Sequence, residues 1–384
     1  MEKRISPAEQ HFFFGYYDLQ PFDVNGKYHL AHHVGFMDRL HEKDDEAEIG
    51  LIELDTLKYS PITTTKAWNF QQGAMLRWNP AKPDREIIYN ALIGGQYVAV
   101  TEDIHTGKKK YADRSIANIS KDGKYGLSIN MSRLYNFRPG YGYATIPDPF
   151  YNENHSANDG IYLVDMETGK SKMIISMEQI WDYSGSFFGG IDKKMVINHI
   201  TFNPSANRFL FLVRDFHTPT KQIHDTAVIT ADLEGKNWHK LCEYGWYNSH
   251  YHWKNDDTVI FYAKINGKNR GAGEVGNYEL RDQSEECTRI GRDIFVRDNH
   301  MTYSNDGKRL LWDSYPDADM MQTLAITDLA TMETQSLGKY VSMRPACTDV
   351  RCDLHPRWNT DCTKVSFDST HEGYRGIYVI EELL

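Results

Sequence analysis

The sequence predicts an all-β fold, a seven-bladed β-propeller with four-stranded antiparallel blades. The first observation is a phrase that recurs seven times along the 384 residues: an aromatic or apolar residue, a turn, and a β-rich run. The second is the spacing of about 50 residues between most copies, which is the length of one blade. The third is a companion phrase after most copies, a short apolar run followed by a hairpin turn such as D-x-x-T-G-K.

Each copy has one anchor residue just before its turn. In chain order the anchors are Phe22, Trp78, Ile119, Phe202, Trp253, Tyr303 and Trp358. Each unit is therefore expected to form strand, Asp-Gly-type turn, strand, loop, strand, hairpin turn and strand, because such turns supply the positive φ of tight hairpins. The last copy is one strand short, so we expect the segment Lys3–Pro7 to supply the missing outer strand.

One interval between anchors is much longer than the others. The extra length falls at 132–159, a stretch rich in Gly, Pro, Tyr and Asn between the strands of the third blade. Long loops in compact domains are usually functional or disordered, and the aromatic content here favours an ordered lid. We expect 1–384 to be a single domain with this lid-like insertion, and a short helix only at 177–190.

Composition excludes several classes of protein. There are 43 Lys+Arg against 53 Asp+Glu, a net charge of −10, without a basic block. This argues against nucleic acid as the main ligand, because phosphate neutralisation dominates that affinity. No stretch approaches about 18 apolar residues, which argues against a membrane span, and the start lacks a signal-peptide pattern, so we expect a cytoplasmic protein. Five scattered cysteines do not suggest a disulfide framework.

Four histidines occupy one register of the repeat. The residue three positions before the anchor is His199, His250, His300 and His355 in blades four to seven, and Leu19, Met75 and Ile116 in blades one to three. We expect this position at the start of each innermost strand, facing a common channel. Since histidine is only 16 of 384 residues, chance does not explain the coincidence. Neutral imidazole binds metals and acts as a base, although an inherited packing role is the alternative.

The last histidine of this register has a cysteine nearby. Cys352 and His355 are three residues apart and enter the strand whose neighbour carries His300. Thiolate and imidazole form a ligand set that zinc prefers, so these three residues predict a divalent metal site, with zinc favoured. The alternative is an inert buried cysteine.

Several arginines, tyrosines and one amide are expected to bind substrate. Arg214 ends an apolar run near His199, where a guanidinium matches a carboxylate bidentately. The other candidates flank the histidines or lie on the insertion or before the second inner strand: Arg133, Arg138, Tyr141, Tyr143, Arg351 and Gln72. For any one of them, a surface or backbone-pairing role is the alternative.

The second half of the chain resembles a known family. The motifs H-I-T-F-N-P, N-S-H-Y-H-W and D-N-H-M-T-Y-S-N-D-G resemble those of the seven-bladed propeller polysaccharide lyases, especially oligogalacturonate lyase, with ulvan lyases as more distant relatives. The resemblance implies that His250 is the base and that His300 binds metal. Cys352 and His355 would replace the family's remaining ligands, a Gln and two His, and manganese is the metal that such enzymes use.

The implied reaction is β-elimination on an acidic oligosaccharide. Arg214 or the metal would neutralise a uronate carboxylate, and His250 would remove the proton from C5. His199 or a tyrosine of the insertion, Tyr141 or Tyr143, would protonate the leaving oxygen. The product would be a 4,5-unsaturated uronide.

Two other classes of function stay open. One is a propeller glycoside hydrolase with a histidine-based site, which the scarcity of carboxylates at the register disfavours. The other is a non-catalytic propeller that binds carbohydrate or protein, since fold does not determine function.

Overall fold

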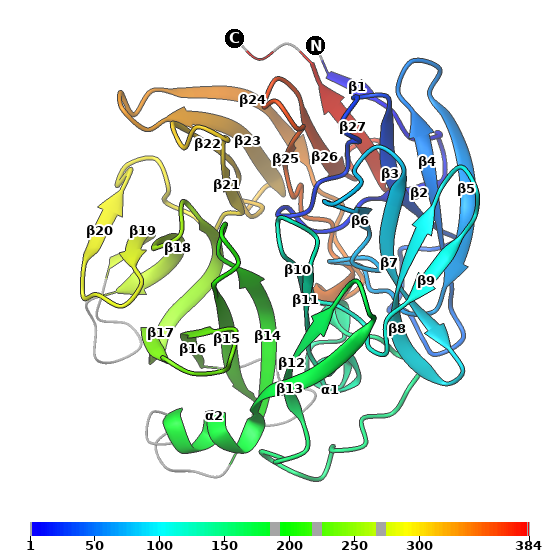
Figure 1. Ribbon diagram of the computed structural model, residues 1–384. Helices are drawn as coiled ribbons and strands as arrows, with labels where there is room; N and C mark the ends of the chain where they lie inside the picture. Colours follow the sequence, from blue (N-terminus) through cyan, green and yellow to red (C-terminus); the bar gives the residue numbers. More distant parts are fainter. Residues whose placement is uncertain (1, 185–192, 217–224, 266–273, 382, 384) are drawn as a thin grey trace. The chain divides into compact units, whose positions relative to one another are not determined.

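The computed structural model describes residues 2–184, 193–216, 225–265, 274–381 and 383. The fold is a seven-bladed β-propeller with four-stranded antiparallel blades, as the repeats predict (Figure 1). The strands described form five sheets of four strands and one sheet of seven. The larger sheet holds two blades, because the long strand β17 (His239–Trp253) is the last strand of blade four and the first of blade five.

The first three blades are separate sheets of four strands. Blade one contains β2 (His11–Phe13), β3 (Tyr28–Val34), β4 (Ala47–Glu53) and β5 (Lys58–Thr65). Blade two contains β6 (Arg77–Trp78), β7 (Glu86–Ile93), β8 (Gln96–Asp103) and β9 (Lys109–Tyr111). Blade three contains β10 (Asn118–Ile119), β11 (Tyr125–Ser128), β12 (Gly160–Asp165) and β13 (Lys170–Ser176).

The last four blades follow in the same order along the chain. Blades four and five contain β14 (Lys194–Phe202), β15 (Arg208–Phe216), β16 (Thr226–Asp232), β17, β18 (Thr258–Ile265), β19 (Glu274–Arg281) and β20 (Cys287–Ile290). Blade six contains β21 (Met301–Tyr303), β22 (Arg309–Asp313), β23 (Met321–Asp328) and β24 (Thr334–Val341). Blade seven contains β25 (Arg357–Trp358), β26 (Val365–Ser369), β27 (Gly376–Ile380) and β1 (Glu2–Arg4).

The N-terminal strand completes the last blade, which confirms the prediction from the short seventh copy. β1 pairs antiparallel with β27, with Glu2 opposite Ile380 and Arg4 opposite Tyr378. The two ends of the chain therefore share one sheet, and β27 has a partner on both sides.

The anchor residues of blades two to seven lie in the first strand of their blade, whereas blade one differs. There, β2 begins the ladder with His11 opposite Val34, and the anchor Phe22 forms only an isolated bridge to His29. Residues 14–21 leave the ladder between these two points. Gly15 starts this excursion with φ +139°, and a Cβ there would lie 3.0 Å from the Gln72 carbonyl oxygen. The conformation therefore favours glycine.

Two α-helices occur in the described chain, so the expectation of a single helix is wrong. α2 (Met177–Ser184) lies where the sequence predicts it, and the rest of 177–190 is outside the described residues. α1 (Met131–Phe137) opens the long insertion, with Asn130 as its N-cap, and a 3₁₀ turn, η1 (Pro139–Tyr141), follows. The Pro and Gly after this short run hide its helical spacing in the sequence. Neither helix has the length and apolar character needed to cross a membrane.

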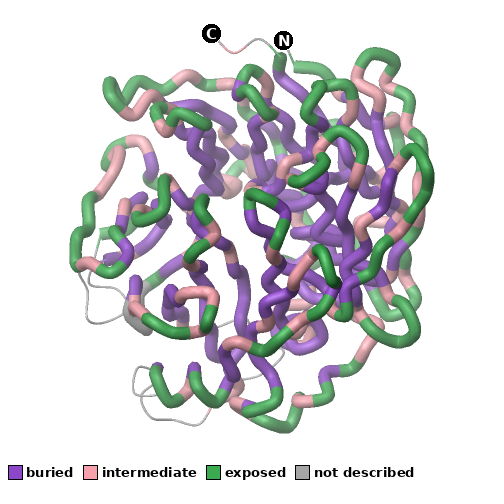
Figure 2. Tube along the Cα trace, viewed as in Figure 1, coloured by how far each residue is buried: buried purple, intermediate pink, exposed green. Residues whose placement is uncertain are grey.

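The chain divides into two compact units. The first comprises Met1–Leu92, Val100–Lys110 and Arg297–Leu384, and the second comprises Ile93–Ala99 and Tyr111–Val296. Each unit has an apolar cluster between neighbouring blades, one around Val259 and Phe261 in the second unit and one around Val365 and Phe367 in the first. Figure 2 shows buried residues following the strands and exposed residues gathering at many of the turns.

Two core histidines of blade one should make the protein sensitive to acid. His29 and His32 are both fully buried on β3. Burial lowers the pKa of His32 to about 4 and that of His29 to about 3. His32 Nδ1 donates to the Phe14 carbonyl oxygen at 2.8 Å, and its Nε2 accepts the Ala74 N–H at 3.0 Å, so a second proton would remove an acceptor. The folded protein therefore holds both rings neutral.

We expect the free energy of unfolding to fall as the pH drops from about 6.5 toward 4, because the unfolded chain binds protons on these rings and the folded chain does not. The expected loss is on the order of a few kcal/mol, measured by urea unfolding at pH about 7 and about 4.5. His32→Gln should flatten this slope, whereas the exposed His105→Gln should leave it unchanged. An unchanged slope in His32→Gln would contradict the assignment.

Candidate active site

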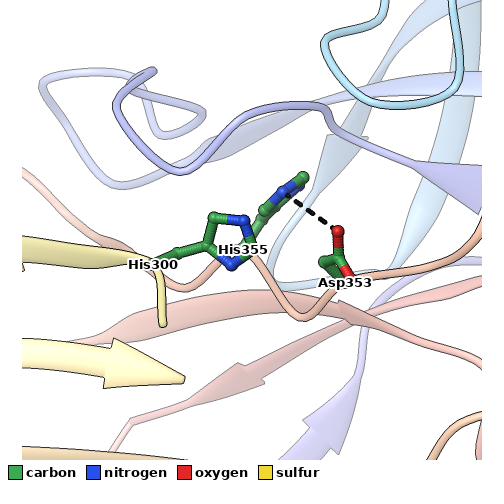
Figure 3. A group of neighbouring side chains, drawn as sticks. All are labelled: His300, Asp353 and His355. Carbon is green, nitrogen blue, oxygen red and sulfur yellow. Dashed lines mark ion pairs between the residues drawn. The ribbon is translucent and has the colours of Figure 1, made fainter. Parts of the chain in front are cut away.

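Three buried side chains in the first unit have the composition and spacing of a metal site. His300, Asp353 and His355 each offer one ligand atom, and these atoms lie within 4.8 Å of one another. Figure 3 shows the group, in which His355 Nε2 is 3.9 Å from Asp353 Oδ2. His300 immediately precedes β21, and the other two residues lie just before β25. Two imidazoles and a carboxylate are a donor set that binds divalent cations.

Hydrogen bonds orient both imidazoles of this group. His300 Nδ1 donates to the Asp313 carboxylate at 2.9 and 3.0 Å, and Asp313 Oδ2 also accepts the His355 backbone N–H at 3.0 Å. His355 Nδ1 donates to the Gly15 carbonyl oxygen at 3.0 Å. Because a neutral imidazole carries one N–H, both rings keep their lone pair on Nε2. Carboxylate and carbonyl partners of this kind orient metal-binding histidines.

The charges around this group favour a cation. Burial lowers the pKa of His300 to about 4, so this ring is neutral near pH 7. Asp353 accepts a hydrogen bond from Arg351 Nε at 2.7 Å. These contacts therefore include two negative carboxylates, Asp313 and Asp353, and one positive guanidinium. The excess negative charge would attract a divalent cation.

Cys352 lies beside the group without belonging to it, which corrects the expected ligand set. Among the described residues, Asp353 joins the two histidines instead. Burial raises the pKa of the Cys352 thiol to about 12, so the thiol stays protonated near pH 7. Without a thiolate ligand, the reason for favouring zinc disappears, and imidazole with carboxylate is also compatible with manganese.

The excursion of blade one packs two aromatic rings against the metal candidates. The Tyr16 ring lies 4.8 Å from the His355 ring, and the Tyr17 ring lies 5.0 Å from the His300 ring. Both tyrosines are buried. The sequence H-F-F-F-G-Y-Y-D leaves open whether this segment closes a blade or serves a site, and these two rings lie at the candidate site.

The second unit contains a pair of arginines that share one amide. Arg214, at its predicted place near the end of β15, is 3% exposed. Its Nη1 donates to Asn198 Oδ1 at 2.7 Å, and Nη1 of Arg138 donates to the same oxygen at 2.8 Å. Asn198 is fully buried on β14, and the sequence does not single it out. A neutral amide is thus the shared acceptor of two cations.

His199 lies at the same place, against the insertion. Its ring packs edge-on against Tyr141 at 5.2 Å, and the Arg138 guanidinium lies 4.3 Å from the Tyr141 ring. Arg138 and Tyr141 both come from the predicted insertion, and Tyr141 is buried. The structure therefore brings together four of the predicted site residues: Arg138, Tyr141, His199 and Arg214.

The register position of the histidines is irregular backbone. Met75, His199 and His355 all have positive φ, at 54°, 68° and 43°. Because Met75 shares this conformation, the positive φ at this position does not depend on histidine. In blades four and five the strand pairing also shifts across His199 and His250. These strands begin before the histidines, unlike the expectation, and the irregularity re-aims the side chains.

His250, the predicted base, is buried within β17. Its Nδ1 lies 3.2 Å from Ser249 Oγ, a contact that can orient the ring. Its role as base still rests on the strand register and on the resemblance. That all four register histidines face one channel also stays a prediction.

Arg133 has structural partners, unlike the expected substrate contact. Its guanidinium pairs with Asp148 at 3.3 Å and donates to the carbonyl oxygens of Phe150, Glu153, Asn154 and Met195. These contacts occupy its donors and hold the insertion to β14. Arg133 therefore anchors the insertion.

The remaining predicted residues lie in varied surroundings. Tyr143 is buried and packs against Tyr97 with ring centroids 5.2 Å apart. Arg351 holds Asp353 of the metal group. Gln72 is buried, with its backbone N–H donating to Asn69 Oδ1 at 2.7 Å, so its use as a sugar-binding amide stays a prediction.

Asp353 and Asp313 are candidate functional residues that sequence reasoning missed. Asp353 lies two residues before His355, a spacing that places side chains on one face of extended chain, and this signal could have found it. Asp313 ends β22 and acts through His300, so no local motif marks it.

No family model matches the sequence, and no curated protein matches it. Among solved structures, an oligogalacturonate lyase in complex with manganese is similar over 100% of this chain and 93% of its own, with a TM-score of 0.71 and 15% identity. The oligogalacturonate lyase from Vibrio parahaemolyticus covers 98% of this chain and 92% of its own, with a TM-score of 0.68 and 16% identity.

A third similar structure is the propeller domain of the Trilobed protease from Pyrococcus furiosus. It covers 97% of this chain and 94% of its own, with a TM-score of 0.54 and 12% identity. Lyases and a protease domain therefore share this propeller, and at such identities the likeness establishes the fold alone.

Proposed function

We propose that this protein is a lyase that cleaves oligosaccharides containing uronic acid by β-elimination, giving 4,5-unsaturated products. The observation that carries the proposal is Arg214, a buried guanidinium whose acceptor among the described residues is the neutral amide oxygen of Asn198. A buried arginine of this kind matches the carboxylate of a bound uronate. The similar lyase structures agree with the proposal.

In the proposed reaction, Arg214 binds the uronate carboxylate and stabilises the negative charge that develops when the C5 proton leaves. His250 accepts that proton. The electron pair of the C5–H bond forms the C4–C5 double bond, and the C4–O4 bond breaks toward oxygen. His199 or Tyr141, which pack against each other beside Arg214's partner Asn198, gives the leaving oxygen its proton.

The donor set of His300, Asp353 and His355 fits a divalent cation, because two oriented Nε2 lone pairs and a buried carboxylate converge. These residues would hold the ion, and a bound ion would supply a Lewis acid. The nature of the ion, zinc or manganese, is a matter for elemental analysis.

The test is to incubate the protein with a panel of uronic oligosaccharides, with neutral oligosaccharides as the control. Elimination creates a conjugated double bond, so ultraviolet absorbance should rise, and the product masses should sum to the substrate mass. Hydrolysis would instead add one water and no absorbance. Products that contain the added water, or no cleavage of any uronide in the panel, would contradict the proposal.

A further inference from the structure

The buried arginines of this chain differ in how their charge is balanced. Arg133 pairs with Asp148, and Arg357 forms a two-pronged contact with Asp368. The part-buried Arg208 pairs with Asp282. Buried Arg375 instead donates to two backbone carbonyl oxygens, those of Val350 and Arg351. A buried charge without an opposite charge is costly, so pairing with a carboxylate is the expected state.

Among the described residues, neither buried Arg214 nor part-buried Arg138 has a carboxylate partner. Within the described residues their shared acceptor is Asn198 Oδ1, and neither guanidinium forms an ion pair with a carboxylate. Nε of each arginine and Nδ2 of Asn198 are buried without a hydrogen-bond acceptor. Two positive charges and several unused donors therefore meet at one neutral oxygen.

The position of Arg138 is set by the insertion. Arg138 is the C-cap residue of α1, and α1 is held at its other end by Asn130, whose side chain caps the helix and donates to Asp148 and Asp159. Arg133 in the same helix binds β14 through the Met195 carbonyl oxygen. The insertion is thus anchored so that Arg138 reaches Asn198.

We propose that Arg138 and Arg214 together form a site for one carboxylate of the ligand, with Asn198 as the positioning residue that holds both guanidiniums. This proposal rests on the proposed function in taking the carboxylate to be that of a uronic acid. A carboxylate between the arginines would balance the charge of the two guanidiniums and accept from the unused donors. The insertion then determines the choice of acidic over neutral sugars, because it supplies Arg138.

The experiment measures binding without cleavage. The probe is galacturonate, a free monosaccharide without a glycosidic bond to break, and galactose is the neutral comparison. In titration calorimetry the protein should bind galacturonate more tightly than galactose. Asn198→Asp should weaken galacturonate binding about 10–100-fold, since a charge-assisted hydrogen bond is worth that factor. It should also raise Tm, because the new carboxylate pairs with both arginines.

Two further variants sharpen the result. Asn152→Asp makes the same charge change at an exposed position on the same insertion, and it should leave both binding and Tm as in the wild type. Arg138→Gln should weaken galacturonate binding, and Arg138→Lys should restore it only in part, because an ammonium cannot reproduce the guanidinium fork. Circular dichroism checks that each variant keeps the strand signature.

Several outcomes would overturn the proposal: wild-type protein that does not bind galacturonate or does not prefer it to galactose, or unchanged binding in Asn198→Asp or Arg138→Gln. The proposed function fails differently. If galacturonate binds as expected while no uronide is cleaved, the arginine site stands and the lyase proposal falls. If uronides are cleaved while Asn198→Asp binds galacturonate as tightly as the wild type, the arginine site is refuted and the lyase proposal stands.

Discussion

Replacing His250 by alanine should lower the rate of uronide cleavage about 10²–10⁴-fold, because that is the contribution of a positioned general base. The fold should survive, since the loss of one ring leaves the strand pairing of β17 intact. The measurement is kcat/KM for the absorbing product across a pH series. The ascending limb that a neutral imidazole base produces should disappear in the variant.

The matched control for His250 is His239→Ala, at the start of the same strand. This variant should keep both the rate and the pH profile of the wild type. If His250→Ala still cleaves, at a near-native rate, a substrate that the native protein cleaves, the base is elsewhere. His199 and Tyr141, which pack together beside the arginine pair, would then be the leading candidates.

Elemental analysis should find about one divalent ion per chain, and Asp353→Asn should lose it. The amide retains the shape of the carboxylate but removes its negative charge. The two neutral imidazoles cannot replace that charge in offsetting the cation. Activity should fall with the ion, because a Lewis acid contributes several kcal/mol to charge stabilisation. The same loss is expected after treatment of the native protein with a chelator.

Variants of two neighbouring residues test the metal prediction further. Asp313→Asn should weaken metal binding about 10–100-fold, as expected for a group that orients a ligand without touching the ion. Cys352→Ala is the control, since this buried protonated thiol lies outside the group, and the ion should be retained. Loss of the ion in Cys352→Ala with retention in Asp353→Asn would reverse the assignment. A metal-free native protein whose activity resists chelation would refute the metal site.

The repeats by themselves determined the propeller. Turns and alternating strands are local features of a sequence. Each blade can therefore be predicted from about 50 consecutive residues. The short seventh copy also indicated that the N-terminal segment pairs with the last blade, which β1 and β27 confirm. The sequence also identified four residues of the arginine site by their positions. Arg214 ends an apolar run, His199 lies at the histidine register, and Arg138 and Tyr141 lie on the insertion.

The limits of the sequence are clearest at α1 and β2. The apolar spacing of Met131, Leu134 and Phe137 is too short to predict a helix next to Pro139, and burial of that face against the protein stabilises it. In blade one, the repeat phrase placed the anchor Phe22 at the end of a first strand, just before the turn. The actual excursion at 14–21 brings Gly15 close to Gln72, which lies in the connection between β5 and β6.

Only the tertiary structure decided which side chains complete each site. The Gly15 carbonyl oxygen that orients His355 lies 340 residues away in the chain, and Asp313 joins His300 to the His355 backbone across 42 residues. Asn198 becomes notable only when two arginines from separate segments meet at its oxygen. The physical reason is that residue type and local spacing specify strands and turns, whereas burial, charge balance and the direction of a lone pair depend on neighbours brought together by folding.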